Sequence, residues 1–425
     1  MGAAGDAHRS CASGNAEVTL PHGTDVLCMI DAIPGDVPFA YFENRDGSSQ
    51  LGIGVVEVVR FEAASLEAIL ERVSSGGSWI GGIRFDPENT PAPTTHDPWH
   101  AFGAAWFLRP AILIASDGGT TRMFVEPGNG ALANRVLRAL RESEQGYSRE
   151  PGCDASWSTL GGEPAWQHAF DRAMDTIRRG ELDKVVLARA WSSRVAPTTR
   201  FGSLLRSSAR RTSSCFRYVL RPEPGSCFAG TTPELLARST SNVFASEAVA
   251  GTMRSEHAAH LIEDDKNCRE HAFVADSIDR VLHECGASRV LRGDPFVRAH
   301  GSLSHIVTSF EARGVASPQA CIARLHPTPA VCGHPRRPAL EFIREHEGID
   351  RGFYSGLVGT IDGNVIELAV ALRCALLDRE EAIVYAGGGI VAGSDRASEA
   401  LELEDKSAQW RNLLCSGARV ESRLE

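Results

Sequence analysis

Two glutamates and a lysine are spaced at helical intervals near the C-terminus. In the segment SEALELEDK (398–406), Glu399 and Glu402 are three residues apart, and Lys406 follows four residues after Glu402. On a helix these side chains share one face, and two adjacent carboxylates suit a hard divalent cation such as Mg²⁺. The same spacing fits a solvated acidic face with one salt bridge. This segment alone leaves both interpretations open.

A lysine and a second glutamate could exchange protons with a substrate. Lys184 opens the apolar run LDKVVLAR, where burial would lower its pKa and make it a general base near neutral pH. Glu234, in TTPELLAR, is the corresponding acid candidate, because a partly buried carboxyl has a raised pKa and can donate a proton. The alternative for Lys184 is a strand-end side chain that extends to solvent.

Glycines and a further acidic segment complete the set of candidates. In YAGGGIVAGSD (385–395), three glycines follow a predicted strand and precede the acidic helix. Their N–H groups could approach an anion closely, although a tight turn is the simpler explanation. In EDDKNCREHAFV (263–274), Glu270 could be a third metal ligand. His271 is more readily explained as a structural residue.

The elements that must position these residues fall into blocks. Apolar residues at helical spacing predict helices over residues 164–179, 265–285 and 397–415. Apolar runs predict strands over residues 184–195, 216–220, 228–229, 243–246, 365–376 and 382–386, and strand-like segments over 26–33, 51–61 and 111–116. Grouped strands with helices between them, without βαβ alternation, predict an α+β fold with large, mostly antiparallel sheets.

Composition excludes several classes of function. The chain has 425 residues, 43% of them hydrophobic, and a formal net charge of −10. It has no Lys/Arg-rich run, so nothing favours binding to nucleic acid or to an anionic membrane surface. No apolar stretch reaches the roughly 18 residues of a membrane span, and the N-terminus lacks the apolar core of a signal peptide. Eleven scattered cysteines without a CxxC motif favour reduced thiols and a cytoplasmic location.

The order and spacing of the candidate segments resemble the chorismate-utilising enzymes: isochorismate, salicylate, anthranilate and aminodeoxychorismate synthases. The matching segments are LDKVVLARA (182–190), FAGTTPELLAR (228–238), SEAVAGT (246–252), DKNCREHAFV (265–274), SHIVTSFEA (304–312), LHPTPAVCG (325–333), EGIDRGFYSGLVG (347–359), ELAVALRCA (367–375) and the glycine-rich and acidic segments of 385–406. The resemblance covers about residues 157–414. It departs from the common family pattern at TTPE, where Ser-Pro-Glu is more frequent, and at the triple glycine, where Gly-Ala-Gly is more frequent.

The resemblance implies a fold and an organisation. We expect two packed, mostly antiparallel sheets with helices outside and a cleft for the substrate. Residues 1–16 are expected to be disordered, residues 17–150 to form an N-terminal lobe of the same unit, and residues 151–425 to form the chorismate-binding catalytic region. The N-terminal third carries no motif that matches the family.

The resemblance also implies a role for each candidate residue. Lys184 stands at the position of the general base and Glu234 at that of the general acid, while Glu270, Glu399 and Glu402 match the carboxylates that hold Mg²⁺. The expected substrate-binding residues are Ala250, Gly251, Thr252, His305, Ala330, Tyr354, Arg373, Gly387, Gly388, Gly389 and Lys406. The three glycines match a loop whose amides meet a carboxylate.

Two alanines favour the isochorismate synthase type within this family. Ala250 stands where aminodeoxychorismate synthases carry a nucleophilic lysine, and Ala330 stands where salicylate and anthranilate synthases tend to carry a threonine. The expected reaction is a Mg²⁺-dependent isomerisation in which water adds at C2 of chorismate and the C4 hydroxyl leaves. The product could feed siderophore, salicylate, dihydroxybenzoate or menaquinone biosynthesis.

Alternatives remain open at this point. They are a salicylate synthase, an anthranilate-synthase-like amine transfer, and a non-catalytic chorismate-binding protein. We expect chorismate as the only partner, with no nucleic acid, no membrane and no obligatory partner protein, and a monomer as the default state.

Overall fold

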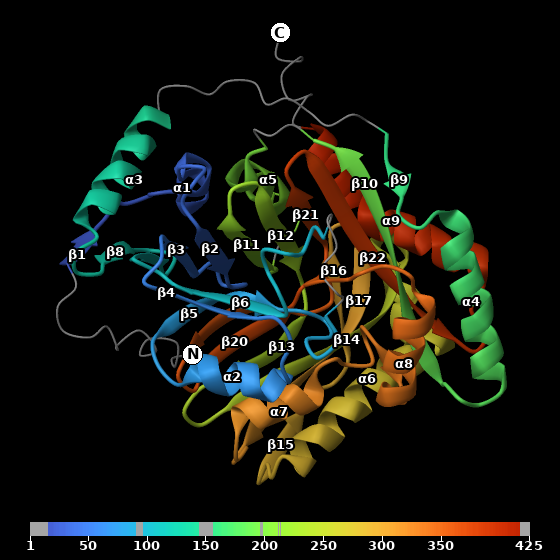
Figure 1. The fold of residues 1–425 in the computed structure, drawn as a ribbon. Coiled ribbons are helices and arrows are strands. Elements are labelled where there is room, and N and C mark those ends of the chain that lie inside the picture. Colours follow the sequence, from blue (N-terminus) through green and yellow to red (C-terminus); the bar gives the residue numbers. More distant parts are fainter. Residues whose placement is uncertain are drawn as a thin grey trace.

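Two antiparallel sheets form the centre of the molecule, and helices lie around them (Figure 1). The computed structural model describes residues 16–90, 97–143, 156–195, 199–210, 212 and 214–416. Every strand pairing in this part of the chain is antiparallel. The predicted α+β class, with two antiparallel sheets, is confirmed.

The larger sheet has twelve strands among the described residues. In spatial order they are β1 (Ala16–Thr19), β8 (Thr121–Val125), β7 (Ile112–Ser116), β3 (Ser49–Ile53), β2 (Phe39–Glu43), β11 (Phe216–Glu223), β12 (Ser226–Thr232), β21 (Cys374–Asp378), β22 (Glu381–Val391), β10 (Lys184–Arg194) and β18 (Gly333–His334), with β9 (Ser158–Thr159) also paired to β10. Strands from the N-terminal third therefore continue the same sheet as strands from the C-terminal part.

The smaller sheet has ten strands in the described part of the chain. They follow the order β15 (Arg289–Arg292), β17 (Leu303–Arg313), β14 (Phe244–Arg254), β13 (Leu235–Ser239), β20 (Val365–Val370), β19 (Leu357–Asp362), β5 (Ser78–Ile83), β6 (Ala105–Arg109) and β4 (Glu57–Phe61), with β16 (Phe296–His300) paired to β17. N-terminal and C-terminal strands meet here as well, where β5 pairs with β19.

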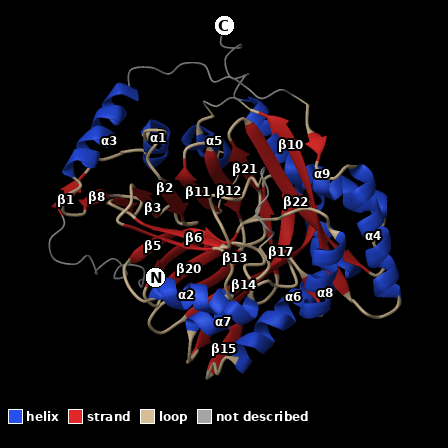
Figure 2. Cartoon of the chain, in the orientation of Figure 1, coloured by secondary structure: helices blue, strands red, loops and turns tan. Residues whose placement is uncertain are grey.

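Helices occupy the periphery of the molecule, as Figure 2 shows. Against the ten-stranded sheet pack α2 (Leu66–Ser74), α6 (Asp265–Glu284) and α7 (Pro318–Leu325). Against the twelve-stranded sheet pack α4 (Glu163–Arg178), α5 (Phe201–Ala209), α8 (Arg336–His346) and α9 (Arg396–Ser416), and α1 (Val26–Ala32) contacts α5 and α3 (Gly130–Ser143). The 3₁₀ helix η1 (Ser255–Glu263) leads from β14 into α6.

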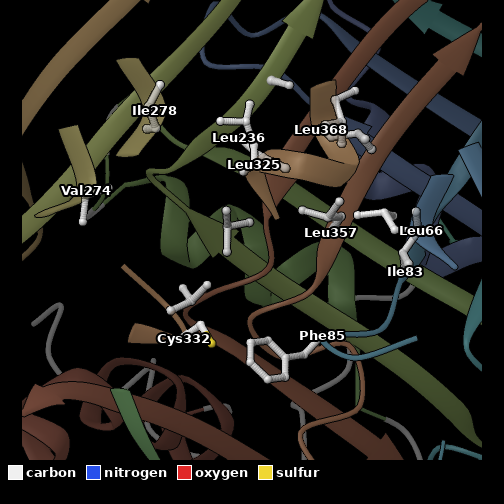
Figure 3. Close-up of a cluster of buried hydrophobic side chains, with 14 of the residues drawn as sticks. Leu66, Ile83, Phe85, Leu236, Val274, Ile278, Leu325, Cys332, Leu357 and Leu368 are labelled. Carbon is white, nitrogen blue, oxygen red and sulfur yellow. The ribbon is translucent and has the colours of Figure 1, made fainter. Parts of the chain in front are cut away.

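Buried apolar side chains fill the space between the sheets and beneath the helices. Figure 3 shows one such cluster, in which Val274 and Ile278 of α6 lie with Leu325 of α7 and with sheet residues such as Leu236 and Leu368. Val274 and Ile278 are four residues apart and both are buried, so they present one apolar face of α6 to the sheet. This packing fixes α6, and with it Glu270, relative to the strands.

The predicted helices are confirmed at α4, α6 and α9, but the strand-like interpretation of residues 26–33 is wrong. This segment is α1. Asp25 accepts hydrogen bonds from the N–H groups of Leu27 and Cys28, which is an N-cap. Val26, Met29 and Ile30 are its buried residues, at spacings of three and four. A short apolar run does not distinguish a buried helix from a strand, and here the cap decides.

Three predicted strand segments differ in extent from the observed strands. Residues 51–61 belong to β3 and β4, which lie in different sheets and are separated by Gly54 at φ +68°. Residues 365–376 likewise belong to β20 and β21. The strand predicted over residues 382–386 is part of β22 and continues through the glycines to Val391.

Some expectations fall wholly or partly outside the described residues. These include residues 1–15 of the expected disordered N-terminus, whereas Ala16 begins β1. No helix among the described residues is long and apolar enough to cross a membrane. Eight described cysteines form no disulfide, as expected. Cys415 is an exception because it is disulfide-bonded.

Candidate active site

The chain crosses between the two sheets at two neighbouring points, and each crossing carries a candidate residue. Pro233 and Glu234 connect β12 of the larger sheet to β13 of the smaller one, and Ala371–Arg373 connect β20 back to β21. The crossings are hydrogen-bonded to each other, from the Thr231 N–H to the Arg373 carbonyl (3.0 Å) and from the Val370 N–H to the Glu234 carbonyl (3.1 Å). Glu234 and Arg373 are thereby held on adjacent segments.

A small cavity of about 80 Å³ lies at these crossings. Twelve of the sixteen candidate residues line it: Glu234, Ala250, Gly251, Thr252, Glu270, His305, Ala330, Tyr354, Arg373, Gly387, Gly389 and Lys406. Lys184, Gly388, Glu399 and Glu402 lie behind or beside its walls.

Glu234 is a buried carboxyl that stays protonated at neutral pH. Its side chain is buried, with 2% of the residue exposed. Burial, with a smaller contribution from Glu247, raises its pKa to about 8, although Lys184 and Arg45 partly oppose the shift. A carboxyl that is still protonated near neutral pH can donate a proton, which is the property required of a general acid.

Lys184 begins β10 and is completely buried. Its Nζ lies 3.0 Å from Oε1 of Glu270 on α6. The strand-end position that the sequence predicted is confirmed, but its ammonium points inward instead of reaching solvent. A lysine held in this way has one defined position beside the cavity.

Each of the three expected metal ligands forms an ion pair with a different lysine. Besides Lys184–Glu270, the pairs are Lys266–Glu399 at 2.7 Å and Lys406–Glu402 at 2.5 Å. The sequence contains only these three lysines, whereas lysine and arginine together number 44. Every lysine of the chain therefore lies at this site.

The carboxylates surround one of these ammonium groups. Burial would lower the pKa of Lys266, but Glu399, Glu402 and Glu270 outweigh it and raise that pKa. Burial and then Glu402 raise the pKa of Glu399. Among the described residues no three acidic, histidine or cysteine side chains are grouped as ligands of one ion. The carboxylate oxygens nevertheless suit Mg²⁺ chemically. In this structure they surround the ammonium group of Lys266, which lies between α6 and α9.

Arg373 is held by a chain of polar contacts across the cavity wall. Its Nη2 donates to Nε2 of His305 (3.3 Å), and Nδ1 of His305 lies 3.1 Å from Oγ1 of Thr252. Since arginine only donates, Nε2 must be the acceptor, so Nδ1 carries the hydrogen. Burial and the charge of Arg373 hold the pKa of His305 well below its usual range, which keeps this ring neutral. The Thr252 hydroxyl hydrogen remains available to a ligand.

Gly251 directs Thr252 into the cavity. The register of β14 against β17 shifts between Ala250 and Thr252, which marks a β-bulge. Gly251 has φ +74°, and a Cβ there would lie 3.0 Å from the carbonyl oxygen of Asn267. The Thr252 N–H donates to Oδ1 of Asn267 (2.9 Å). The bulge therefore joins the cavity wall to the start of α6.

The three consecutive glycines lie in a strand, so the expectation of a loop was wrong. Gly387, Gly388 and Gly389 belong to β22 and pair with Ala188, Leu187 and Val186 of β10. Alternate residues of a strand face opposite sides. Gly387 and Gly389 line the cavity, whereas a Cβ on Gly388 would point toward Glu399 and Leu403 of α9.

Several residues of the site carried no signal in the sequence. Ser355 has φ +61°, and its buried hydroxyl, without a hydrogen-bond partner, borders the cavity. Tyr385 stacks on Tyr354 with ring centroids 5.3 Å apart. Lys266 stood inside a segment that resembles the family but was not singled out. Its ion pair with Glu399 joins two helices that are far apart in the sequence, so only the fold brings them together.

Comparisons with known proteins agree with this architecture. The sequence profile described as "Chorismate binding enzyme" matches residues 59–414. The salicylate biosynthesis isochorismate synthase of Pseudomonas aeruginosa is 29% identical over 79% of this chain and 73% of its own length. Isochorismate synthase MenF of Haemophilus influenzae is 28% identical over 87% of this chain and 85% of its own length.

Solved structures share the same fold. Menaquinone-specific isochorismate synthase MenF of Escherichia coli aligns with a TM-score of 0.77 and 25% identity, covering 94% of both chains. Anthranilate synthase component I of Streptococcus pneumoniae aligns with a TM-score of 0.68 over 97% of this chain and 95% of its own, at 16% identity, which shows the fold alone. Because the matching profile spans well over half of the sequence, this chain belongs to the chorismate-binding enzyme family.

Proposed function

We propose that this protein converts chorismate to isochorismate. The observation that carries the proposal is a cavity with buried Glu234 in its wall and buried Lys184 beside it, where burial raises the pKa of Glu234 to about 8. Relatives that bear the name isochorismate synthase align over most of this chain. The reaction needs a base to activate water and an acid to protonate the leaving hydroxyl, and these two side chains supply such a pair.

In the proposed reaction, the two groups act at different carbons of the ring. Lys184, as the free amine, takes a proton from the water that attacks C2. Glu234 protonates the hydroxyl that departs from C4, and the ring double bonds shift as that bond breaks. The fork of Arg373, fixed through His305, binds one substrate carboxylate. Positioned proton transfer of this kind contributes about 10²–10⁴-fold in rate.

Glu270, Glu399 and Glu402 would hold Mg²⁺ in this proposal. The ion, when bound, supplies positive charge for the second substrate carboxylate and fixes its orientation. The three ion pairs with lysine support this assignment, because they place each carboxylate against a positively charged group. Binding of the ion requires these carboxylates to exchange ammonium partners for metal.

The choice of water as nucleophile rests on the cavity wall. Ala250 lines the cavity with a methyl group where an amine-transferring relative would carry a lysine. The lysine that would act as a nucleophile at position 250 is therefore absent, which favours water as the attacking group. The eight described cysteines that form no disulfide favour a cytoplasmic location, whereas the disulfide-bonded Cys415 argues against it.

The test is to incubate the purified chain, without a partner protein or nitrogen donor, with chorismate and Mg²⁺. Products are identified by chromatography and mass spectrometry. We expect isochorismate in equilibrium with chorismate, and reversible loss of turnover when a chelator removes the metal. Salicylate with pyruvate, or anthranilate formed only when ammonia is added, would replace this proposal with another reaction of the family. No turnover in either mixture would indicate a binding protein.

A further inference from the structure

An arginine from the N-terminal third reaches the segment that carries Glu234. Arg45 lies between β2 and β3 and forms a two-pronged ion pair with Glu247 of β14, with Nη1–Oε1 at 2.8 Å and Nη2–Oε2 at 2.6 Å. The same Nη2 also donates to the carbonyl oxygen of Pro233. Its guanidinium lies over the ring of Phe216, 4.6 Å from the centroid.

A second arginine pairs with the same carboxylate. Arg298 of β16 forms two hydrogen bonds with Glu247, at 2.8 and 3.0 Å, and its Nη1 lies 3.5 Å from the Pro233 carbonyl oxygen. The side chains of Arg45, Glu247 and Arg298 are only 17%, 11% and 19% exposed. Burial would raise the pKa of Glu247, but the two arginines lower it to about 2. This carboxylate is therefore ionised near neutral pH.

We propose that Arg45, together with Glu247 and Arg298, positions the general acid by anchoring the peptide carbonyl directly before it. The Pro233 carbonyl belongs to the peptide unit whose N–H is that of Glu234, and that N–H is 3.3 Å from Oγ1 of Thr232. Both ends of this peptide are therefore held. Arg45 is a positioning residue, since it contacts Glu247, Pro233 and Phe216 but does not itself line the cavity. The proposal gives the N-terminal third a part in the chemistry.

Nearby charges also shift the pKa of Glu234, some upward and some downward. The charged groups that influence its carboxyl are Lys184 of β10, Glu247 of β14 and Arg45 of the β2–β3 turn. The polar groups that share the cavity are Arg373, Lys406, Glu270, His305 and the two tyrosines, Tyr354 and Tyr385. Glu247 favours the protonated form of Glu234 and Arg45 opposes it. Removing the charge of Glu247 should therefore lower the pKa of Glu234, and removing the charge of Arg45 should raise it.

The test compares Arg45→Gln with Glu247→Gln in the full chain with Mg²⁺. We expect kcat to fall by up to about 10²-fold in each, with KM changed less, because the acid is displaced while the carboxylate-binding residues are intact. The alkaline limb of the kcat/KM profile should move to higher pH in Arg45→Gln and to lower pH in Glu247→Gln. Arg45→Lys keeps the charge, so it should leave the limb in place but restore only part of kcat.

Arg217→Gln is the matched control. Arg217 of β11 pairs with Glu43 of β2, and its side chain is 9% exposed against 17% for Arg45. Its other side-chain hydrogen bond goes to the Thr212 carbonyl and not to that of Pro233. It should cost stability without moving the alkaline limb. The proposal would be overturned if the alkaline limb of the kcat/KM profile lay at the same pH in Arg45→Gln and Arg217→Gln. It would also be overturned if this limb moved in the same direction in Arg45→Gln and Glu247→Gln.

The inference rests on the proposed role of Glu234 as acid, and a direct titration separates the two. Isotope-edited infrared spectra can follow the Glu234 carboxyl in each variant, with Glu234→Gln identifying its band. Opposite shifts of that band in Arg45→Gln and Glu247→Gln would establish the electrostatic part even if the chain made another product. If the band shifts in opposite directions but Glu234→Gln is still active, the role of Glu234 as general acid is wrong and the electrostatic part of the inference stands. An unshifted band would overturn the inference alone.

Discussion

The three lysines illustrate how much a single residue type reveals once the fold is known. The arginine guanidinium is less strongly hydrated than the lysine ammonium and is always charged. Lysine carries a compact charge and can lose its proton. A chain that uses arginine nearly everywhere retains lysine only where it faces Glu270, Glu399 or Glu402. In the proposed function, these positions take a group that can act as a base or give way to a metal ion.

Lys266 should compete with Mg²⁺ for the carboxylates. Its Nζ lies 2.7 Å from Oε1 of Glu399 and is influenced by all three glutamates. Lys266→Met removes that cation, so we expect Mg²⁺ to bind more tightly, by about tenfold for each 1.4 kcal/mol of competition removed. The measurement is isothermal titration of Mg²⁺ into the metal-free protein without substrate.

Arg254→Met provides the control for that titration. Arg254 pairs with Asp405 of α9 at 2.8 Å, so it also ties η1 to this helix, but it does not contact the three glutamates. Its Mg²⁺ affinity should match that of the wild type. A weaker affinity in Lys266→Met would mean that the lysine holds Glu399 in place for the metal and does not compete with it.

Glu234→Gln should be inactive and yet more stable. A carboxyl whose pKa rises from 4.5 to about 8 on folding favours the folded state less as pH rises through this window, because only the unfolded chain gains by releasing the proton. Gln cannot ionise. Its advantage in the free energy of unfolding should be small at pH 4, grow above pH 4.5 and reach up to about 3 kcal/mol at pH 7.

Denaturant unfolding at pH 4 and pH 7 measures this difference. Glu381→Gln, on the exposed start of β22, should show no comparable gain with pH. A Glu234→Gln variant whose stability follows that of the wild type at both pH values would contradict a protonated Glu234.

Residue types alone did not decide the site. Glu399 and Glu402 at helical spacing fitted a solvated surface as well as a metal site, and Lys184 fitted a strand end. The resemblance selected among these alternatives, and the structure places twelve of the sixteen candidates on one cavity. Arg45 and Lys266 were not predicted, since their partners are 202 and 133 positions away in the sequence and no local pattern connects them.

At the scale of elements, the decisive features are the two crossings between the sheets. Residues 365–376 are continuously apolar but for a few positions, and this pattern does not reveal which sheet a residue enters. The break comes from the backbone, where Arg373 adopts φ +48°. Arg373 lines the cavity and directly precedes β21, which begins at Cys374. The sequence pattern predicted strand structure here but not the change of sheet.

The alternation of β22 predicts unequal effects at adjacent glycines. A Cβ on Gly389 would lie 2.4 Å from Oε1 of Glu270 and 2.9 Å from Cε of Lys184. Gly389→Ala should therefore displace both groups and reduce kcat by about 10²-fold or more. A Cβ on Gly388 would lie 3.5 Å from both Oε2 of Glu399 and Cδ2 of Leu403, which is ordinary contact. Gly388→Ala should keep most of the activity.

Steady-state kinetics of the two variants, with circular dichroism to verify the fold, tests this difference. Equal activities would mean that the cavity does not lie on the Gly389 face of the strand. Loss of activity in Gly388→Ala alone would place the substrate against α9.

At the scale of the whole molecule, the N-terminal third is part of both sheets. Its strands join the rest of the chain where β2 pairs with β11 and where β5 pairs with β19. Side chains from both parts also share one core: Phe107 of β6 is buried in the same cluster as Leu357 and Leu368. The sequence had no motif in this region. Its role follows from strand pairing, which depends on contacts between distant segments.

Both parts should therefore unfold together. Along a denaturant series, hydrogen exchange measured by mass spectrometry should show β5–β6 and β19–β20 losing protection at the same midpoint. Phe107→Ala removes a completely buried ring and should lower both midpoints equally, at a cost of about 3–5 kcal/mol. Val58→Ala, at a position on β4 that is 39% exposed, should leave them nearly unchanged. Earlier loss of protection in β5–β6 alone would show that the N-terminal strands are a separate unit, and Arg45 could then reach Glu247 only while that unit stays folded.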